Sequence, residues 1–248
     1  MKTAISLNLG SQVWRYAFPA VRWERLYEVF RRGVDLLVAL GGGLLALPLM
    51  LLIAVLIKLD SPGPVIYAQE RVGQNRRRSN RTFNGLIYYR RRWIPDRRHR
   101  AAEGRPFVMY KFRTMRQDAE KETGPVWATE DDPRTTRVGR FLRKTRLDEL
   151  PQLFNLLKGD MTLIGPRPER PYFVEKLKGV VPNYLRRLEV KPGITGLAQV
   201  RNGYDRSLED VKRKVENDLY YIEHRSPWLD LSILVQTVLV VLTGRGAC

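Results

Sequence analysis

One long apolar segment dominates the hydrophobic pattern of the chain. From Val34 to Ile57 the sequence reads VDLLVALGGGLLALPLMLLIAVLI. As a helix rising ~1.5 Å per residue, this run is long enough for a bilayer core of ~30 Å. Core helices of soluble proteins seldom stay apolar on every face over such a length. The pattern therefore predicts a helix that inserts into a membrane.

Two features of this segment bear on whether it crosses the membrane. Pro48 lies at its middle and Gly41–Gly43 precede it, so a kink is expected where the proline removes a helical hydrogen bond. Basic residues flank both ends, with Arg31 and Arg32 before the run and Lys58 after it. The positive-inside rule draws both ends to the cytoplasm. These residues are equally compatible with a broken helix that returns on the same side and with a kinked helix that spans.

The remaining pattern divides the chain into three parts. Residues 1–32 alternate aromatic side chains with arginines, which predicts an amphipathic segment in the headgroup region. Residues 33–60 form the membrane helix, and residues 61–248 form a cytoplasmic domain. Within that domain Val65–Val72 and Phe107–Thr114 have strand character, and Trp228–Leu242 predicts an interfacial or core-docking helix.

Charge indicates an anionic partner. The 248 residues carry 44 Lys and Arg against 26 Asp and Glu, a net charge of +18, which favours nucleic acid, an anionic membrane or a phosphorylated substrate. Much of the excess lies in a basic insertion at residues 75–105, whose arginines alternate with aromatic residues. Beside a membrane helix, anionic lipid is the favoured ligand, and an exposed loop without a ligand is the alternative.

The scarcity of histidine and cysteine limits the chemistry. The chain has two histidines and a single cysteine, Cys248. These residues are too few to favour a Ser-His-Asp triad or a thiolate metal cluster. A single cysteine also excludes an intrachain disulfide and fits a reducing compartment. Acid–base or nucleophilic work therefore falls to carboxylates.

The densest group of such residues surrounds Asp148 and Glu149. Pro151 follows closely, so a helix is expected to begin near Asp148, where backbone N–H groups favour anions. Three basic side chains precede the acids: Arg140, Arg143 and Lys144. The segment thus supplies carboxylates for a divalent cation and guanidinium groups for phosphate. From the residues alone the commoner interpretation is structural, with Asp148 as N-cap and Glu149 as a first-turn acid, both paired with arginines.

Four sequence blocks in a fixed order favour a catalytic interpretation of Asp148 and Glu149 over this structural one. They are IKLDSPGPVIYAQERVG (57–73), KFRTM (111–115), RLDELPQLFNLLKGDMTLIGPRPE (146–169) and VKPGITGLAQV (190–200). Together they resemble the bacterial sugar transferase family, the monotopic phosphoglycosyl transferases. The resemblance implies a helix-rich α+β domain on the membrane, a re-entrant helix broken at Pro48 and interfacial amphipathic helices. It places both termini and the active site at the cytoplasmic face of the bacterial inner (plasma) membrane.

The resemblance also implies a reaction. A sugar-1-phosphate would pass from a UDP-sugar to polyprenyl (undecaprenyl) phosphate through a covalent aspartyl intermediate, with release of UMP. This would be the first membrane step of exopolysaccharide, capsule or glycoconjugate synthesis. The family's nucleophile and Mg²⁺ ligand match Asp148, and its adjacent glutamate matches Glu149. The expected substrate-binding residues are Lys111, Arg113, Arg143, Pro166, Arg167 and Pro168.

Two other functions stay open at this point. One is a non-enzymatic basic membrane protein that binds anionic lipid or nucleic acid, and the other is a polyprenyl-phosphate hydrolase with water as acceptor. Under the transferase interpretation the partners are the UDP-sugar, the polyprenyl phosphate and membrane lipids, and no nucleic acid is expected. The sugar and the oligomeric state, a homodimer included, are not encoded in these motifs.

Overall fold

The computed structural model describes residues 10–75, 104–121, 124, 126, 132–202 and 207–243, with side chains from Trp23 onward. Nearly all of the basic insertion predicted at 75–105 lies outside these residues. The described part combines many helices with two small sheets of two strands each, which confirms the helix-rich α+β class.

The N-terminal part of the described chain is one long bent helix. It consists of α1 (Gly10–Leu37), a π-helical turn η1 (Val38–Gly42) and α2 (Gly43–Asp60). The predicted break at Pro48 is wrong in position, because α2 continues through this proline and the irregular turn precedes it. A single proline removes one hydrogen bond, which a bent helix tolerates, whereas the wider π turn contains two of the glycines. The predicted boundary at residue 32 falls inside α1.

The apolar part of this helix is exposed. Among the described residues, Trp23–Asp60 is the one helix long and apolar enough to cross a membrane, and only 11% of its most apolar stretch is buried. Leu44 and Leu45 are 74% and 84% exposed. A core helix of a soluble protein would bury these side chains, so the exposure is consistent with membrane association.

The remaining elements form a compact body on the helix. Strands β1 (Ile66–Val72) and β2 (Pro106–Phe112) pair antiparallel, which confirms both predicted strands, and β3 (Thr162–Ile164) pairs parallel with β4 (Gly193–Thr195). The helical elements are α3 (Arg137–Lys144), η3 (Leu147–Glu149), α4 (Gln152–Lys158), α5 (Pro171–Leu177), η4 (Tyr184–Glu189), α6 (Leu197–Arg201), α7 (Leu208–Glu223) and α8 (Pro227–Thr243).

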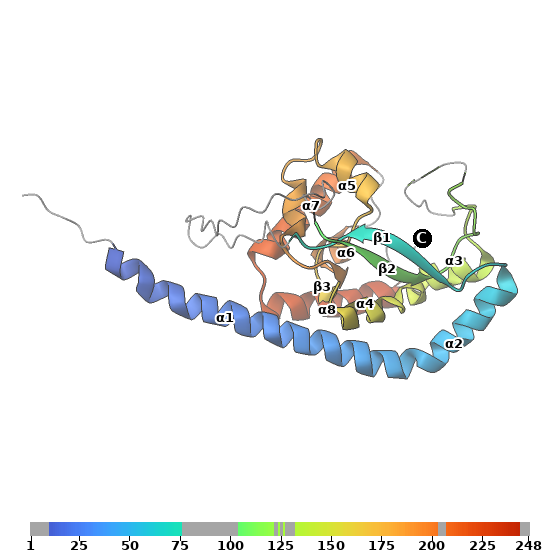
Figure 1. Ribbon diagram of the computed structural model, residues 1–248, viewed down its shortest axis with the longest axis horizontal. Helices are drawn as coiled ribbons and strands as arrows, with labels where there is room; N and C mark the ends of the chain where they lie inside the picture. Colours follow the sequence, from blue (N-terminus) through green and yellow to red (C-terminus); the bar gives the residue numbers. More distant parts are fainter. Residues whose placement is uncertain are drawn as a thin grey trace, which may run out of the picture.

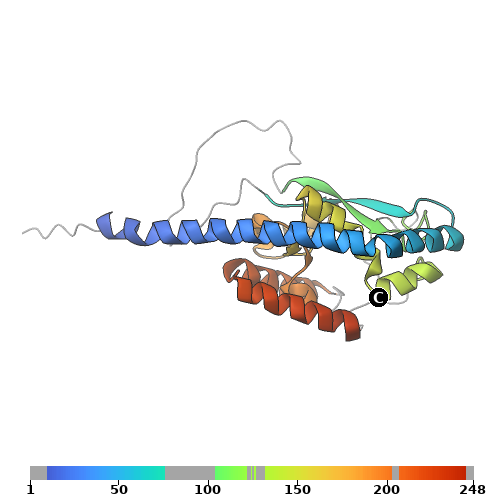
Figure 2. The same cartoon turned by 90° about the horizontal axis from the view of Figure 1, so that it is seen from below.

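The helices are arranged in two groups. Figure 1 shows α1, α2, α4 and α8 along one side of the molecule, with β1, β2, α5 and α7 on the other. In the view of Figure 2 the helix α8, predicted as interfacial or core-docking, runs alongside α1. The body lies on the concave side of the bent helix (Figure 1).

Polar side chains fasten the long helix to strand β3. Arg31 and Asp35 lie one turn apart on the same face and are both buried. The Asp35 carboxylate accepts hydrogen bonds from the Leu163 backbone N–H at 2.7 Å and the Thr162 hydroxyl at 3.1 Å. The Arg31 guanidinium donates to the carbonyl of Ile164. Two charged residues within an apolar helix therefore hold the strand that leads into the Gly165–Pro168 loop.

The same helix also binds α4 and α8. Arg32 donates to the carbonyls of Leu156 and Leu157, at 2.6 and 2.9 Å, near the C-terminus of α4. Tyr27 donates to the Asp230 carboxylate of α8 at 2.6 Å. The membrane helix and the domain are thus joined by buried polar contacts at three elements.

Replacing Asp35 by leucine should destabilise this junction. The Leu163 N–H and the Thr162 hydroxyl would lose their acceptor, at a cost of about 1–3 kcal/mol for a buried donor left unpaired. Thermal unfolding of detergent-purified protein would measure the loss. Asp35→Asn is the matched control, since it keeps an acceptor oxygen and should lose less. Equal melting temperatures for wild type and Asp35→Leu would contradict the fastening role.

Candidate active site

Asp148 and Glu149 lie on a tight turn between α3 and α4. Helix α3 ends at Lys144, and Arg146 then adopts a left-handed conformation with φ of 59°. The 3-10 turn Leu147–Glu149 follows, and α4 begins at Gln152 directly after Pro151. Asp148 is therefore not the N-cap of a helix, and the structural interpretation of this acid as a cap is wrong. The backbone here is irregular, so adjacent acids can both face one cavity.

Asn155 fixes α4 against strand β2. Its side-chain amide donates to the Val108 carbonyl at 2.7 Å and accepts from the Tyr110 N–H at 3.1 Å. Asn155 is fully buried, so these hydrogen bonds are protected from water. They set the register that places Lys111, the next residue of β2, beside the two acids.

Lys111 and Arg167 clamp the acids. The Lys111 Nζ atom lies 3.1 Å from Glu149 Oε1 and 3.7 Å from Asp148 Oδ2. Arg167 donates from Nη2 to Glu149 Oε1 at 2.6 Å and from Nη1 to Glu149 Oε2 at 3.4 Å. Both oxygens of Glu149 are therefore engaged by a bidentate guanidinium. The Asp148 carboxylate lies near one of these two cations, Lys111, so its oxygens are more available to a ligand than those of Glu149.

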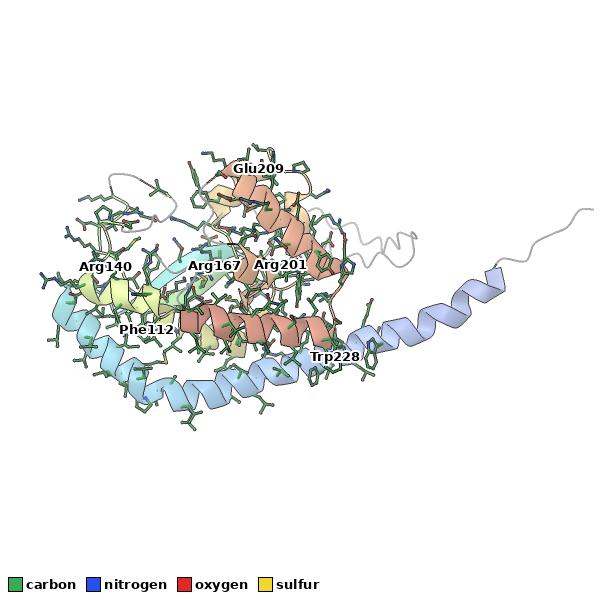
Figure 3. All side chains as sticks on the ribbon, turned by 180° about the vertical axis from the view of Figure 1, so that it is seen from behind. Phe112, Arg140, Arg167, Arg201, Glu209 and Trp228 are labelled. Atoms are coloured by element: carbon green, nitrogen blue, oxygen red, sulfur yellow. The ribbon has the colours of Figure 1, made fainter. Side chains whose placement is uncertain are left out.

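The loop after β3 brings Arg167 into place. The Gly165 N–H donates to the Thr195 carbonyl at 2.8 Å, and the Gly193 N–H donates to the Pro166 carbonyl at 3.0 Å. A Cβ atom on Gly193 would overlap the backbone of Gly165, so this close approach requires glycine. Figure 3 shows Arg167 toward the centre of the molecule and Arg140, on α3, at its edge.

The electrostatics differ between the two acids. Burial alone would raise the pKa of Glu149, but the charges of Arg167 and Lys111 outweigh burial and hold this pKa far below its usual range. Burial raises the pKa of Asp148, against the opposing charge of Lys111. Burial likewise lowers the pKa of Lys111, against the attraction of Glu149. Glu149 is thus a fixed anion, whereas Asp148 is a poorly solvated carboxyl group.

These residues line a cavity of about 500 Å³. Its charged lining consists of Arg71, Lys111, Arg143, Arg146, Arg167 and Lys214 with Asp148, Glu149 and Glu169. Cations outnumber acids there, which suits a ligand that carries phosphate groups. The rest of the wall consists of leucine, isoleucine, valine and alanine side chains and four uncharged polar residues, Thr195, Gln199, Asn202 and Thr237.

The structure brings together some of the predicted residues and not others. Lys111, Arg143, Asp148, Glu149 and Arg167 all line the cavity.

Arg113, Pro166 and Pro168 do not line it, which corrects their prediction as pocket residues. The Arg113 guanidinium is buried and donates to the carbonyls of Ser61 and Pro62, in the turn after α2. The two prolines line a separate small hollow and shape the loop that carries Arg167.

Sequence reasoning missed a second charged group in the cavity. Lys214 of α7 donates to Glu169 Oε1 at 2.6 Å, and Arg71 of β1 lies 3.8 Å from Glu169 Oε2. Burial opposes ionisation of Glu169, but Lys214, Arg187 and Arg71 lower its pKa to about 2. Glu169 ends the GPRPE block and Arg71 lies in the block at 57–73, which were available signals; no motif marks Lys214.

The site offers few carboxylate ligands to a metal ion. Among the described residues no group of three or more His, Cys, Asp or Glu side chains could hold a metal ion. Mg²⁺, however, is commonly bound through one or two carboxylates together with water and substrate phosphates. Asp148 fits this minimal role, because both Glu149 oxygens are engaged by Arg167.

Comparisons with known proteins are consistent with this geometry. The family model described as bacterial sugar transferase matches residues 26–86 and 85–244. A UDP-N-acetylgalactosamine-undecaprenyl-phosphate N-acetylgalactosaminephosphotransferase of Aeromonas hydrophila is 44% identical over 90% of this chain and 46% of its own length. UDP-glucose:undecaprenyl-phosphate glucose-1-phosphate transferases of Escherichia coli K12 and Caulobacter vibrioides are 36% and 37% identical over 89% of the chain.

The matched part of the chain spans 42% of the Escherichia coli relative and 72% of the Caulobacter relative, so it covers less than half the length of two of these three proteins. The family match nevertheless covers nearly all of the described residues, including every charged residue of the cavity. The chain belongs to the bacterial sugar transferase family.

Proposed function

We propose that this protein transfers a sugar-1-phosphate from a UDP-sugar to undecaprenyl phosphate and releases UMP. The observation that carries the proposal is the placement of Asp148, which pairs with Lys111, beside the Glu149–Arg167 ion pair in a cation-rich cavity near an exposed apolar helix. The names of the relatives supply the two substrate classes. The proposed biological place is the first membrane step of a polysaccharide or glycoconjugate pathway.

The reaction has two displacement steps at one phosphorus atom. An Asp148 oxygen attacks the sugar-linked β-phosphorus of the donor, the bond from this phosphorus to the bridging oxygen breaks, and UMP leaves. A phosphate oxygen of the acceptor then attacks the same phosphorus and releases the Asp148 carboxylate. Attack by an anion on a diphosphate needs positive charge on the phosphate oxygens, which Arg143, Arg167 and Lys111 supply. Mg²⁺, held by Asp148 and the donor phosphates, would add to this neutralisation.

Glu149 has a different role from Asp148. Its two oxygens bind Arg167, and Lys111 approaches one of them, so it is poorly placed to attack. It instead orients the two cations that face the donor. Because the Glu149 oxygens are engaged in this way, Asp148 is the proposed nucleophile.

We also propose that the long helix enters and leaves the membrane on one side, at the cytoplasmic face of the inner membrane. Basic residues flank the apolar run at both ends, and the domain lies on the concave side of the bend (Figure 1). The exposed apolar side chains of α8 suit the same lipid surface, with Trp228 at its N-terminal end (Figure 3). In this arrangement a water-soluble donor and a lipid acceptor reach one cavity.

The direct test is UMP release by purified protein in nanodiscs, across a panel of UDP-sugars, with Mg²⁺ and with or without undecaprenyl phosphate. The proposal expects sustained release that requires a sugar donor, the lipid and Mg²⁺, and that stops when EDTA removes the metal. Sustained release without lipid would indicate a hydrolase. No release from any donor, together with strongly salt-dependent DNA binding, would favour the non-enzymatic alternative.

Asp148→Asn should abolish UMP release, with a loss on the order of 10³-fold or more for a removed nucleophile. Asp160→Asn is the matched control, because Asp160 pairs with Lys158 at 3.3 Å and does not line the cavity. The initial rate of UMP formation measures both variants. Comparable rates for Asp148→Asn and wild type would exclude Asp148 as the nucleophile.

The membrane topology predicts one-sided labelling. In a Cys248→Ser background, cysteines replacing Glu24 ahead of the apolar run and Glu70 after it should both react with an impermeant maleimide in inside-out vesicles. Neither should react in right-side-out vesicles. Labelling of the two positions from opposite sides would show that the helix spans the membrane.

A further inference from the structure

The cavity has apolar side chains in its lining as well as charged ones. Two leucines follow Asp148 in the turn and α4, and further apolar residues come from β3, β4, α6 and α8. The apolar lining consists of Leu150, Leu153, Leu163, Ile194, Ala198, Val200, Val240 and Val241. One cavity thus combines cationic side chains near Asp148 with apolar side chains, which matches a ligand with a phosphate head and a hydrocarbon chain.

This inference rests on the proposed function and deepens it. A UDP-sugar has no hydrocarbon chain to place on an apolar wall, whereas polyprenyl phosphate has one directly beyond its phosphate. We propose that the first isoprene units of the acceptor bind between α4 and α8, and that Val240 of α8 is a residue that determines binding of this chain. Contacts between the prenyl chain and this wall then favour a lipid phosphate over inorganic phosphate or water as the acceptor in the second displacement step.

The geometry of α8 supports this assignment. Thr237, Val240 and Val241 are spaced by three and four residues, so they share one helical face, and all three line the cavity. The Thr237 and Thr195 hydroxyls lie 2.7 Å apart, which ties this face to β4. Val238 lies on a different side of α8; it is 58% exposed and does not line the cavity. The helix therefore presents one apolar face to the cavity and another outward.

The location of this wall also gives the chain a path to lipid. Helices α4 and α8 lie on the side of the molecule occupied by the bent apolar helix (Figure 1). Near the apolar lining, Leu242 of α8 is 77% exposed, and Phe154 of α4 is 55% exposed. A prenyl chain that leaves the cavity along α8 meets apolar side chains, so it can pass into the bilayer without crossing a charged surface.

The test separates the two steps of the reaction. Val240→Asn places a polar amide on the proposed chain-binding wall, and Val180→Asn makes the same change at a valine that lies after α5, is 55% exposed and does not line the cavity. Burial of an unpaired amide against hydrocarbon should raise the KM for undecaprenyl phosphate about tenfold in Val240→Asn. The single-turnover release of UMP without acceptor should stay within about twofold of wild type, since the donor does not contact this wall. Val180→Asn should match wild type in both measurements.

Equal acceptor KM values for the two valine variants would overturn the inference. A loss of the single-turnover UMP release in Val240→Asn, with the acceptor KM unchanged, would assign the wall to the donor and would also overturn it.

A second measurement does not depend on turnover. Photo-crosslinking with a polyprenyl phosphate that carries a benzophenone on its first isoprene units should label peptides containing residues 150–153 and 237–241. Label confined to α1 and α2 would contradict the assignment. If wild-type protein releases no UMP from any donor, the proposed function fails, and the crosslinked peptides still decide where the lipid binds.

Discussion

The cavity depends on the ion pairs of Glu149. Arg167 reaches this carboxylate from the loop after β3, Lys111 from β2, and Glu149 itself lies on the turn between α3 and α4. All three side chains are largely buried, so removing one partner would leave charge without compensation inside the protein. The need to pair these buried charges holds together β2, the loop after β3 and the turn between α3 and α4. It also leaves Asp148 beside the cations as the acid that is available to a substrate.

The long helix is part of the same body as the cavity. Asp35 binds the strand that precedes the Arg167 loop, and Arg32 binds carbonyls at the end of α4, the helix that begins just after the two acids. Charged groups are costly in an apolar helix unless they are paired, and these are paired with the domain. The position of the long apolar helix and the placement of the cavity are thus fixed by the same polar contacts.

Much of this was predictable where local pattern decides the outcome. The apolar run, the strands β1 and β2 and the helix α8 follow from hydrophobic periodicity, and motif resemblance identified Asp148, Glu149, Lys111, Arg143 and Arg167. The errors concern features fixed by tertiary contacts. Arg113 is occupied by two carbonyls after α2, and Lys214 reaches Glu169 from a distant helix. The spacing of residues along the sequence does not predict these contacts between distant segments.

The most direct measurement is mass spectrometry of the protein after incubation with a UDP-sugar, without lipid acceptor. The account predicts an added mass of one sugar phosphate, mapped to the peptide containing Asp148 and discharged by undecaprenyl phosphate. UMP formation that requires the lipid acceptor and leaves no adduct, or an adduct located on Glu149, would contradict it.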